Sequence, residues 1–319
     1  MTLQGTGISS TGALRSISGD NTWQGTITAN SDTSINSDSG TFTLSGAIYG
    51  GYARAIGGAG DTVISGAIGG GASGTLTKDG TGTLTLSASN TYTGATTVSA
   101  GTLSYGASNI TADTGGVTVW GGTLNIGAYS DTVGTFTLTT GAITGTTGVL
   151  TGTAYSVRSG TISAVLGGAA DLTKTTQGTV VITSANTYTG ATIINGGVLS
   201  VSSLANGGEA SNIGASTNIA SKLRIDFIAG NGSLSMLRYT GATVSTDRLF
   251  TIGTSANCIS SSGTGGLTFS NTGSLSVSST ITIICSNDIT IASVIGGSIG
   301  IYKEGSGTLT LTGDRKSVV

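Results

Sequence analysis

The chain has 319 residues, of which 56 are glycine and 8% are charged, and it contains neither proline nor histidine. The absence of histidine excludes Ser-His-Asp and Cys-His catalytic groups and the common zinc sites. A net charge of −2 without a basic stripe argues against nucleic acid as a partner. Apolar residues make up 37% of the chain, which argues against disorder.

In chain order, the predicted elements are short β-strands that recur in related segments. The GTFTL strand at Gly40–Leu44 returns at Gly134–Leu138. A longer segment covers residues 64–104, returns at 162–201 and starts a third time at 291–313. Internal repeats of this size are typical of proteins built from stacked units.

Each long copy is predicted to form a strand, a turn and a second strand. Threonine and leucine alternate in Thr83–Leu86, so the leucines point to one face of a strand. Asn90–Gly94 is a predicted turn, because Asn and Gly accept positive φ, and Thr96–Ser99 is the next strand. Lysines align at one position of the three copies: Lys78, Lys174 and Lys303.

These features predict an all-β chain, a single-stranded right-handed parallel β-helix (β-solenoid) that continues from residue 1 to residue 313. No stretch has apolar residues at helical spacing over three turns. A two-stranded unit cannot bury its leucine face alone, whereas stacked units form a continuous apolar column. The lack of proline fits strands that have a hydrogen-bonded neighbour on both sides.

The segment Lys78–Leu103 resembles the passenger-associated transport repeat of autotransporters. Its matching positions are Lys78, Gly80, Gly82, Thr83, Leu84, Leu86, Asn90, Thr91, Tyr92, Gly94, Thr96, Val98, Gly101 and Leu103. The second copy matches at Lys174, Gly178, Asn186, Thr187, Tyr188, Gly190, Thr192, Ile194, Gly197 and Leu199. It departs at Thr176, where the family has glycine, and at Val180.

The resemblance implies a passenger that is exported through a C-terminal outer-membrane β-barrel and whose β-helix assists its own secretion. Residues 1–10 have no basic start and no apolar run of the kind found in signal peptides. We therefore expect the signal sequence and the barrel to lie outside this chain. Residues 314–319 read DRKSVV where the repeat would continue ANTYTG, so we expect a non-native or truncated tail, with a charged terminal cap as the alternative.

Two glycine-rich motifs are weak candidates for ligand sites. Gly69–Gly74 matches GxGxxG, but a strand sequence follows it where a dinucleotide site needs a helix. Gly57–Asp61 is similar to a calcium-binding nonapeptide, but its aspartate comes one residue early and no tandem copy follows. We therefore predict neither cofactor nor metal, and no catalytic residue.

The strongest enzyme alternative is a polysaccharide lyase or hydrolase, a chemistry that uses clustered carboxylates with basic residues. Arg224 and Asp226 are two residues apart on a predicted strand and so share one face. A solvated ion pair is the simpler interpretation. The full charged cluster in the sequence is Lys222, Arg224, Asp226, Arg238, Asp247 and Arg248.

Aromatic residues and cysteines leave further alternatives open. Tyr92 and Tyr188 take matching repeat positions, where packing against the next coil is favoured over a carbohydrate-stacking strip. Trp23 and Trp120 are weaker candidates for ligand contact. Cys258 and Cys285 could form a disulfide or be two small buried apolar residues.

The sequence thus predicts a structural and adhesive stalk segment of an extracellular bacterial surface protein, at the cell surface or secreted, with no catalysis. Its expected partners are surface molecules or glycans of host or neighbouring cells. A carbohydrate-active β-helix enzyme and a self-assembling surface-layer or fibre subunit are the two alternatives.

Overall fold

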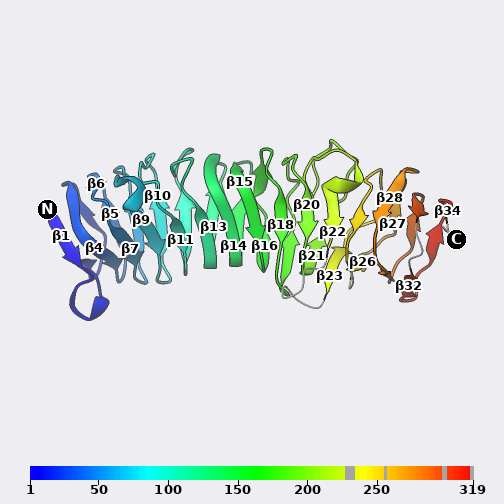
Figure 1. The fold of residues 1–319 in the computed structure, drawn as a ribbon. Helices are drawn as coiled ribbons and strands as arrows, with labels where there is room; N and C mark the ends of the chain where they lie inside the picture. The colour runs from blue at the N-terminus through cyan, green and yellow to red at the C-terminus, as the bar shows by residue number, and fades with distance from the viewer. Residues whose placement is uncertain (227–233, 255–256, 297–299, 317–319) are drawn as a thin grey trace. The chain divides into compact units, whose positions relative to one another are not determined.

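The protein is described here by a computed structural model that covers residues 1–226, 234–254, 257–296 and 300–316. The chain divides into two compact units, and Figure 1 shows the short strands of which they are built. Unit 1 comprises Met1–Thr153 with Ser163–Val165, and unit 2 comprises Ala154–Ile162 with Leu166–Val319. Each unit is built of short parallel strands that stack coil upon coil, so the predicted all-β solenoid is confirmed.

Unit 1 contains two short 3-10 helices and a series of strands. Its helices are η1 (Ile8–Ser10) and η2 (Gly71–Ser73). Its strands are β1 (Thr2–Gly5), β2 (Leu14–Ser16), β3 (Asn21–Trp23), β4 (Ile27–Ser37), β5 (Thr41–Leu44), β6 (Ile48–Tyr49), β7 (Ala53–Gly57), β8 (Asp61–Ile64), β9 (Thr75–Lys78), β10 (Thr83–Leu86), β11 (Thr96–Val98), β12 (Thr102–Tyr105), β13 (Val117–Gly127) and β14 (Asp131–Gly145).

Unit 2 contains the 3-10 helix η3 (Ala220–Lys222) and the remaining strands, while β15 (Val149–Val157) and β17 (Val165–Gly167) include residues of both units. Its strands are β16 (Gly160–Ile162), β18 (Leu172–Lys174), β19 (Thr179–Ile182), β20 (Thr192–Ile194), β21 (Gly197–Val201), β22 (Leu223–Ile225), β23 (Ser235–Tyr239), β24 (Val244–Thr246), β25 (Thr251–Ile252), β26 (Asn257–Ser261), β27 (Leu267–Phe269), β28 (Ser274–Val277), β29 (Ile281–Cys285), β30 (Ile289–Ile291), β31 (Val294–Gly296), β32 (Ile301–Glu304), β33 (Leu309–Leu311) and β34 (Arg315–Lys316).

The coils of unit 1 have sides that line up strand over strand. One side stacks β5, β8, β10 and β12, and the next stacks β7, β9 and β11. Leu84 pairs with Thr62 of the coil before and with Leu103 of the coil after, so one coil takes 19 to 22 residues. This spacing lets every backbone amide of a central strand bond to a neighbouring coil.

The alternation of the strands produces the core. In β10, Leu84 and Leu86 are buried while Thr83 and Thr85 are half-buried on the outer face. The parallel register places the inward-facing residues of successive coils over one another, so apolar side chains form columns inside the solenoid. One such column of unit 1 consists of Leu84, Leu103, Leu124 and Ile143.

Unit 2 is also built of lines of stacked parallel strands, and its later coils contain one more line than its first coils. One line stacks β18, β20, β22, β25, β28, β31 and β34, and a second stacks β19, β21, β23, β26, β29 and β32. From β24 onward a third line forms, of β24, β27, β30 and β33. The coil lengthens before this point, since Gly197 pairs with Ser235.

The third repeat copy lies on another side of the coil than the second, although its lysine takes the same position in the repeat sequence. Lys174 ends β18, in the line that runs to β34, whereas Lys303 lies in β32 and pairs with Ile283 of the second line. Lys174 is buried and Lys303 is exposed. Both lines of strands continue through the long insertion between β21 and β23, so the same repeat sequence can form different sides of a coil.

No helix in the described parts of the chain is long and apolar enough to cross a membrane. In the predicted tail, residues 317–319 lie outside the described residues. The backbone of Arg315 and Lys316 forms β34 and pairs with Ile295 and Gly296.

Candidate functional site

The aligned lysines of the first two copies are buried inside the solenoid and hold the turn that follows them. Lys174 Nζ donates to the carbonyl oxygens of Thr175 (2.7 Å), Thr176 (2.8 Å) and, in the next coil, Gly196 (2.9 Å). An ammonium group has three donors, so all of them are used. In unit 1, Lys78 Nζ makes the equivalent bonds to the carbonyls of Asp79 and Gly80.

Burial carries an electrostatic cost at this position. Loss of hydration lowers the pKa of Lys174 to about 8 and also lowers the pKa of Lys78. Among the residues that the structure describes, no carboxylate pairs with Lys174, and carbonyl oxygens take that place. The lysine therefore acts as a turn-closing group, which explains its recurrence in the repeat.

The asparagine of each turn bridges three coils. In unit 1, the Ile68 amide donates to Asn90 Oδ1 (2.8 Å), and Asn90 Nδ2 donates to the Ile110 carbonyl (2.8 Å). In unit 2, Asn186 Oδ1 accepts from the Leu166 amide (2.8 Å) and its Nδ2 donates to the Asn212 carbonyl (2.9 Å). Both side chains are buried, so each satisfies backbone groups that would otherwise lack partners.

The tyrosine of each turn is buried, and its hydroxyl bonds to the threonine four residues later. Tyr92 Oη lies 2.8 Å from Thr96 Oγ1, and Tyr188 Oη lies 2.8 Å from Thr192 Oγ1. Burial raises the pKa of Tyr92 to about 12. A carbohydrate-stacking strip at these two tyrosines is therefore wrong, and the alternative of packing between coils is confirmed.

The fold separates the charged residues on which the enzyme alternative depends, and it supports the simpler interpretation of an ion pair. Arg224 and Asp226 form a 2.7 Å ion pair, and 44% of the arginine side chain is exposed. Arg248 lies inside, 1% exposed, where its guanidinium bonds backbone carbonyls. Asp247 accepts from the Gly207 amide and from Asn218 Nδ2. These residues support structure and do not face one another across an open groove.

Arg248 has a defined structural role in unit 2. It donates to the carbonyl oxygens of Ala205 (2.9 Å) and Gly214 (2.9 Å) and to Ser216 Oγ (2.9 Å). All three acceptors belong to the long insertion that follows β21. The buried guanidinium of Arg248 therefore holds the insertion in place. The sequence alone places Arg248 in a charged cluster and does not predict this role.

The remaining sequence candidates are also placed. Gly69–Gly74 leads through η2 into strand β9, so the helix that a dinucleotide site requires is absent from this described segment. Asp61 Oδ1 accepts from the Thr83 amide of the next coil at 2.8 Å. Trp120 is 64% exposed, whereas Trp23 is half-buried. Cys258 and Cys285 are both buried free thiols, so the disulfide alternative is wrong.

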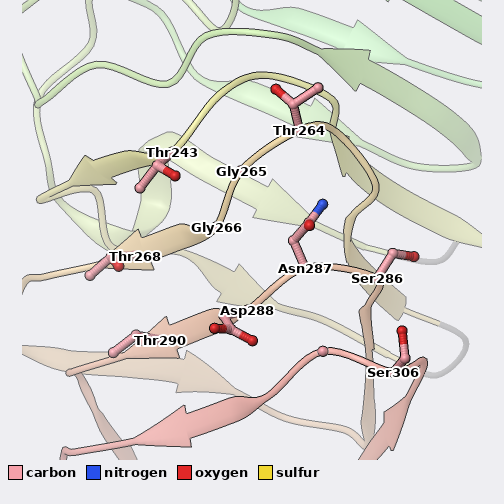
Figure 2. A pocket seen from close by; sticks show the side chains of 11 residues that line it. Thr243, Thr264, Gly265, Gly266, Thr268, Ser286, Asn287, Asp288, Thr290 and Ser306 are labelled. Carbon is pink, nitrogen blue, oxygen red and sulfur yellow. The ribbon is translucent and has the colours of Figure 1, made fainter.

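A polar groove in unit 2 is a concave feature that the sequence did not predict. It has a volume of about 480 Å³ and crosses the turns before β27, β30 and β33. Figure 2 shows Thr243, Thr268 and Thr290 along one side, Ser286 and Ser306 along the other, and Asn287 and Asp288 between them. The remaining lining residues are Thr264, Gly265, Gly266 and Gly307.

Close stacking of the turns forms the floor of this groove. A Cβ added at Gly265 would lie 1.9 Å from the Thr243 amide nitrogen, so only glycine lets the two coils approach. Asp288 Oδ1 accepts from the Thr308 amide of the next coil (2.7 Å), and Asn287 Nδ2 donates to the Gly263 carbonyl (2.7 Å). Two side chains of the groove are therefore fixed in position.

Taken together, the buried lysine, asparagine and tyrosine of each turn define a repeat-bearing β-solenoid, in which the repeat signature serves to join the coils. Comparison with protein families agrees: the family described as Passenger-associated-transport-repeat matches residues 76–104, 172–201 and 301–314. The chain therefore carries the passenger-associated transport repeats that its sequence resembles.

One curated relative is the Adhesin BmaC autotransporter of Brucella suis biovar 1 (strain 1330), which is 38% identical over 212 residues. The match covers 61% of this chain and 6% of the relative, so the chain spans a small part of that protein's length. No solved structure matches the chain significantly.

Proposed function

We propose that the chain is an adhesive stalk segment of a passenger that acts outside the cell, and that it performs no catalysis. The observation that carries the proposal is the burial of the repeat signature. The polar groups of three repeat residues form hydrogen bonds within the solenoid: those of Lys174, Asn186 and Tyr188. The repeat therefore serves to build a rigid scaffold. The outer faces and turns are then free to contact partners.

The name of the relative supports an adhesive role, since that protein is called an autotransporter adhesin. The low charge of the outer faces, rich in threonine and serine, suits contact with surface molecules or glycans of host or neighbouring cells. The cell surface is the location that the repeats and this relative support.

The test is display of residues 1–319 on a laboratory bacterium through an unrelated outer-membrane anchor, with the anchor alone as control. We expect the chain to become accessible to external protease and to increase attachment of the bacteria to epithelial cells. Display without any gain in attachment would contradict the adhesive role. Loss of display, while the anchor alone reaches the surface, would contradict the passenger assignment.

The absence of catalysis has its own test. The purified chain is incubated with acidic and neutral polysaccharides, and reducing ends and unsaturated products are measured. We expect neither to accumulate above the blank. Product release that the substitution Asp226→Asn or Asp288→Asn abolishes would instead establish a carbohydrate-active enzyme.

A further inference from the structure

We propose that the polar groove of unit 2 binds a neutral oligosaccharide, an inference that builds on the proposed adhesive function. The groove presents hydroxyl groups of Thr264, Thr268, Thr290, Ser286 and Ser306, and none of them has a side-chain hydrogen-bond partner among the described residues. Dense, unsatisfied donors and acceptors in a concavity suit a ligand that is itself rich in hydroxyl groups.

The spacing of the groove favours an extended ligand over a compact one. Thr268 and Thr290 pair in register on β27 and β30, so their hydroxyls repeat at the distance between adjacent strands, about 4.8 Å. The rise of one sugar unit in an extended glycan is of comparable length. Successive coils can therefore each offer one hydroxyl to successive sugar units.

Charge selects against acidic glycans. Asp288 is the one charged side chain among the described residues that line the groove, and no lysine or arginine lines it. Its Oδ1 is occupied by the Thr308 amide, while its Oδ2 has no described partner and can accept from a sugar hydroxyl. A uronic acid or a sulfated sugar would meet this carboxylate without any compensating cation.

The same count of carboxylates favours binding over hydrolysis. Glycoside hydrolysis uses two carboxyl groups on either side of the scissile bond. Asp288 has no second carboxylate beside it among the described lining residues. The groove is thus suited to hold a glycan and not to cleave it.

The experiment measures binding of the purified chain to neutral hexasaccharides of glucose, mannose and xylose, and to oligogalacturonate of equal length, by saturation-transfer NMR and calorimetry. The double variant Thr268→Val/Thr290→Val removes two hydroxyls and keeps side-chain shape. The matched control is Thr77→Val/Thr97→Val, because Thr77 and Thr97 pair in the same way on β9 and β11 of unit 1, outside the groove.

We expect at least one neutral hexasaccharide to bind, oligogalacturonate to bind more weakly, and the groove variant to lose about tenfold in affinity while the control does not. Asp288→Asn is expected to reduce the difference in affinity between the neutral hexasaccharide and oligogalacturonate. Absence of binding to every neutral hexasaccharide, or equal loss in groove and control variants, would overturn the proposal. If displayed cells still attach in that case, the groove assignment fails and the adhesive function stands.

Discussion

Lys174 Nζ donates a 2.8 Å hydrogen bond to the carbonyl oxygen of Thr176, two residues further along the turn. Thr176 has φ +66°, a left-handed conformation that costs a β-branched residue free energy. The equivalent residue in unit 1 is Gly80, with φ +71°. The lysine-closed turn therefore requires a left-handed residue at its second position, and the second copy meets this requirement with strain.

Replacing Thr176 with glycine is expected to stabilise the chain. Relief of the left-handed conformation gains about 1–2 kcal/mol, of which about 0.4–1 kcal/mol is lost to the greater freedom of glycine in the unfolded chain. We expect a net gain of about 0.5–1 kcal/mol in the free energy of unfolding, measured by urea denaturation.

The reverse change at the equivalent turn is the control. A Cβ at Gly80 would lie 2.4 Å from the Gly58 carbonyl oxygen, so Gly80→Thr adds a collision to the backbone strain. Gly80→Thr is expected to lower the free energy of unfolding. This loss should be larger than the gain from Thr176→Gly. Equal and small effects at both positions would show that the left-handed turn does not limit stability.

The bridging asparagines predict a larger effect. Asn90→Ala leaves the Ile68 amide and the Ile110 carbonyl without their side-chain partner, and each orphaned buried group costs about 1–3 kcal/mol. The Ile110 carbonyl still accepts from the Asn90 backbone amide. We therefore expect a loss of about 2–4 kcal/mol in the free energy of unfolding, measured by denaturation.

An isosteric change separates hydrogen bonding from packing. Asn90→Asp keeps the shape but replaces the donor to the Ile110 carbonyl with a carboxylate oxygen. It should destabilise the chain at neutral pH and regain stability in acid, where the protonated carboxyl can donate again. A pH-independent loss would contradict the hydrogen-bonding role.

How far the sequence predicts this molecule depends on the residue type. The alternation around Leu84 and Leu86 is enough to place these side chains inside, because a strand has only two faces. Lys78 could not be placed in the same way, since an isolated lysine is rarely buried. Its burial depends on carbonyl groups that converge only once the turn has formed.

Two further features depend on which strands stack on one another, which the sequence does not state. The third copy lies on another side of the coil than the second, with Lys303 in β32 and Lys174 in β18. The polar groove is lined by separate turns, such as those at Gly265 and Asp288. None of these turns carries a sequence pattern that predicts a ligand site. Only the stacking register brings their hydroxyl groups together.

Buried tyrosine makes the stability depend on pH in the alkaline range. Burial raises the pKa of Tyr92 from its ordinary 10.0 to about 12, so between these values the folded chain keeps a proton that the unfolded chain loses. The contribution of Tyr92 is fully present below pH 10 and is lost as pH rises toward 12. The expected loss is about 2–3 kcal/mol, measured by denaturation at a series of pH values.

Tyr92→Phe tests this assignment. The variant should lose about 1 kcal/mol at neutral pH, because the bond between the tyrosine hydroxyl and Thr96 Oγ1 is gone. Its free energy of unfolding should then fall less steeply with alkaline pH than that of the unaltered chain. An unchanged slope would mean that Tyr92 ionises normally in the folded chain.

The register of β26 and β29 also determines whether the two thiols can form a disulfide. Cys258 pairs with Thr282, and Cys285 pairs with Ser261, so each cysteine lies three positions away from the rung of the other. Both thiols are buried, and burial raises the pKa of Cys258 to about 12, which suppresses the reactive thiolate. We expect a maleimide reagent to label neither cysteine rapidly in the folded chain and both after unfolding in guanidinium chloride. Intact mass measured without reductant should show two free thiols, and a disulfide or immediate labelling of the folded chain would mean that β26 and β29 pair in another register.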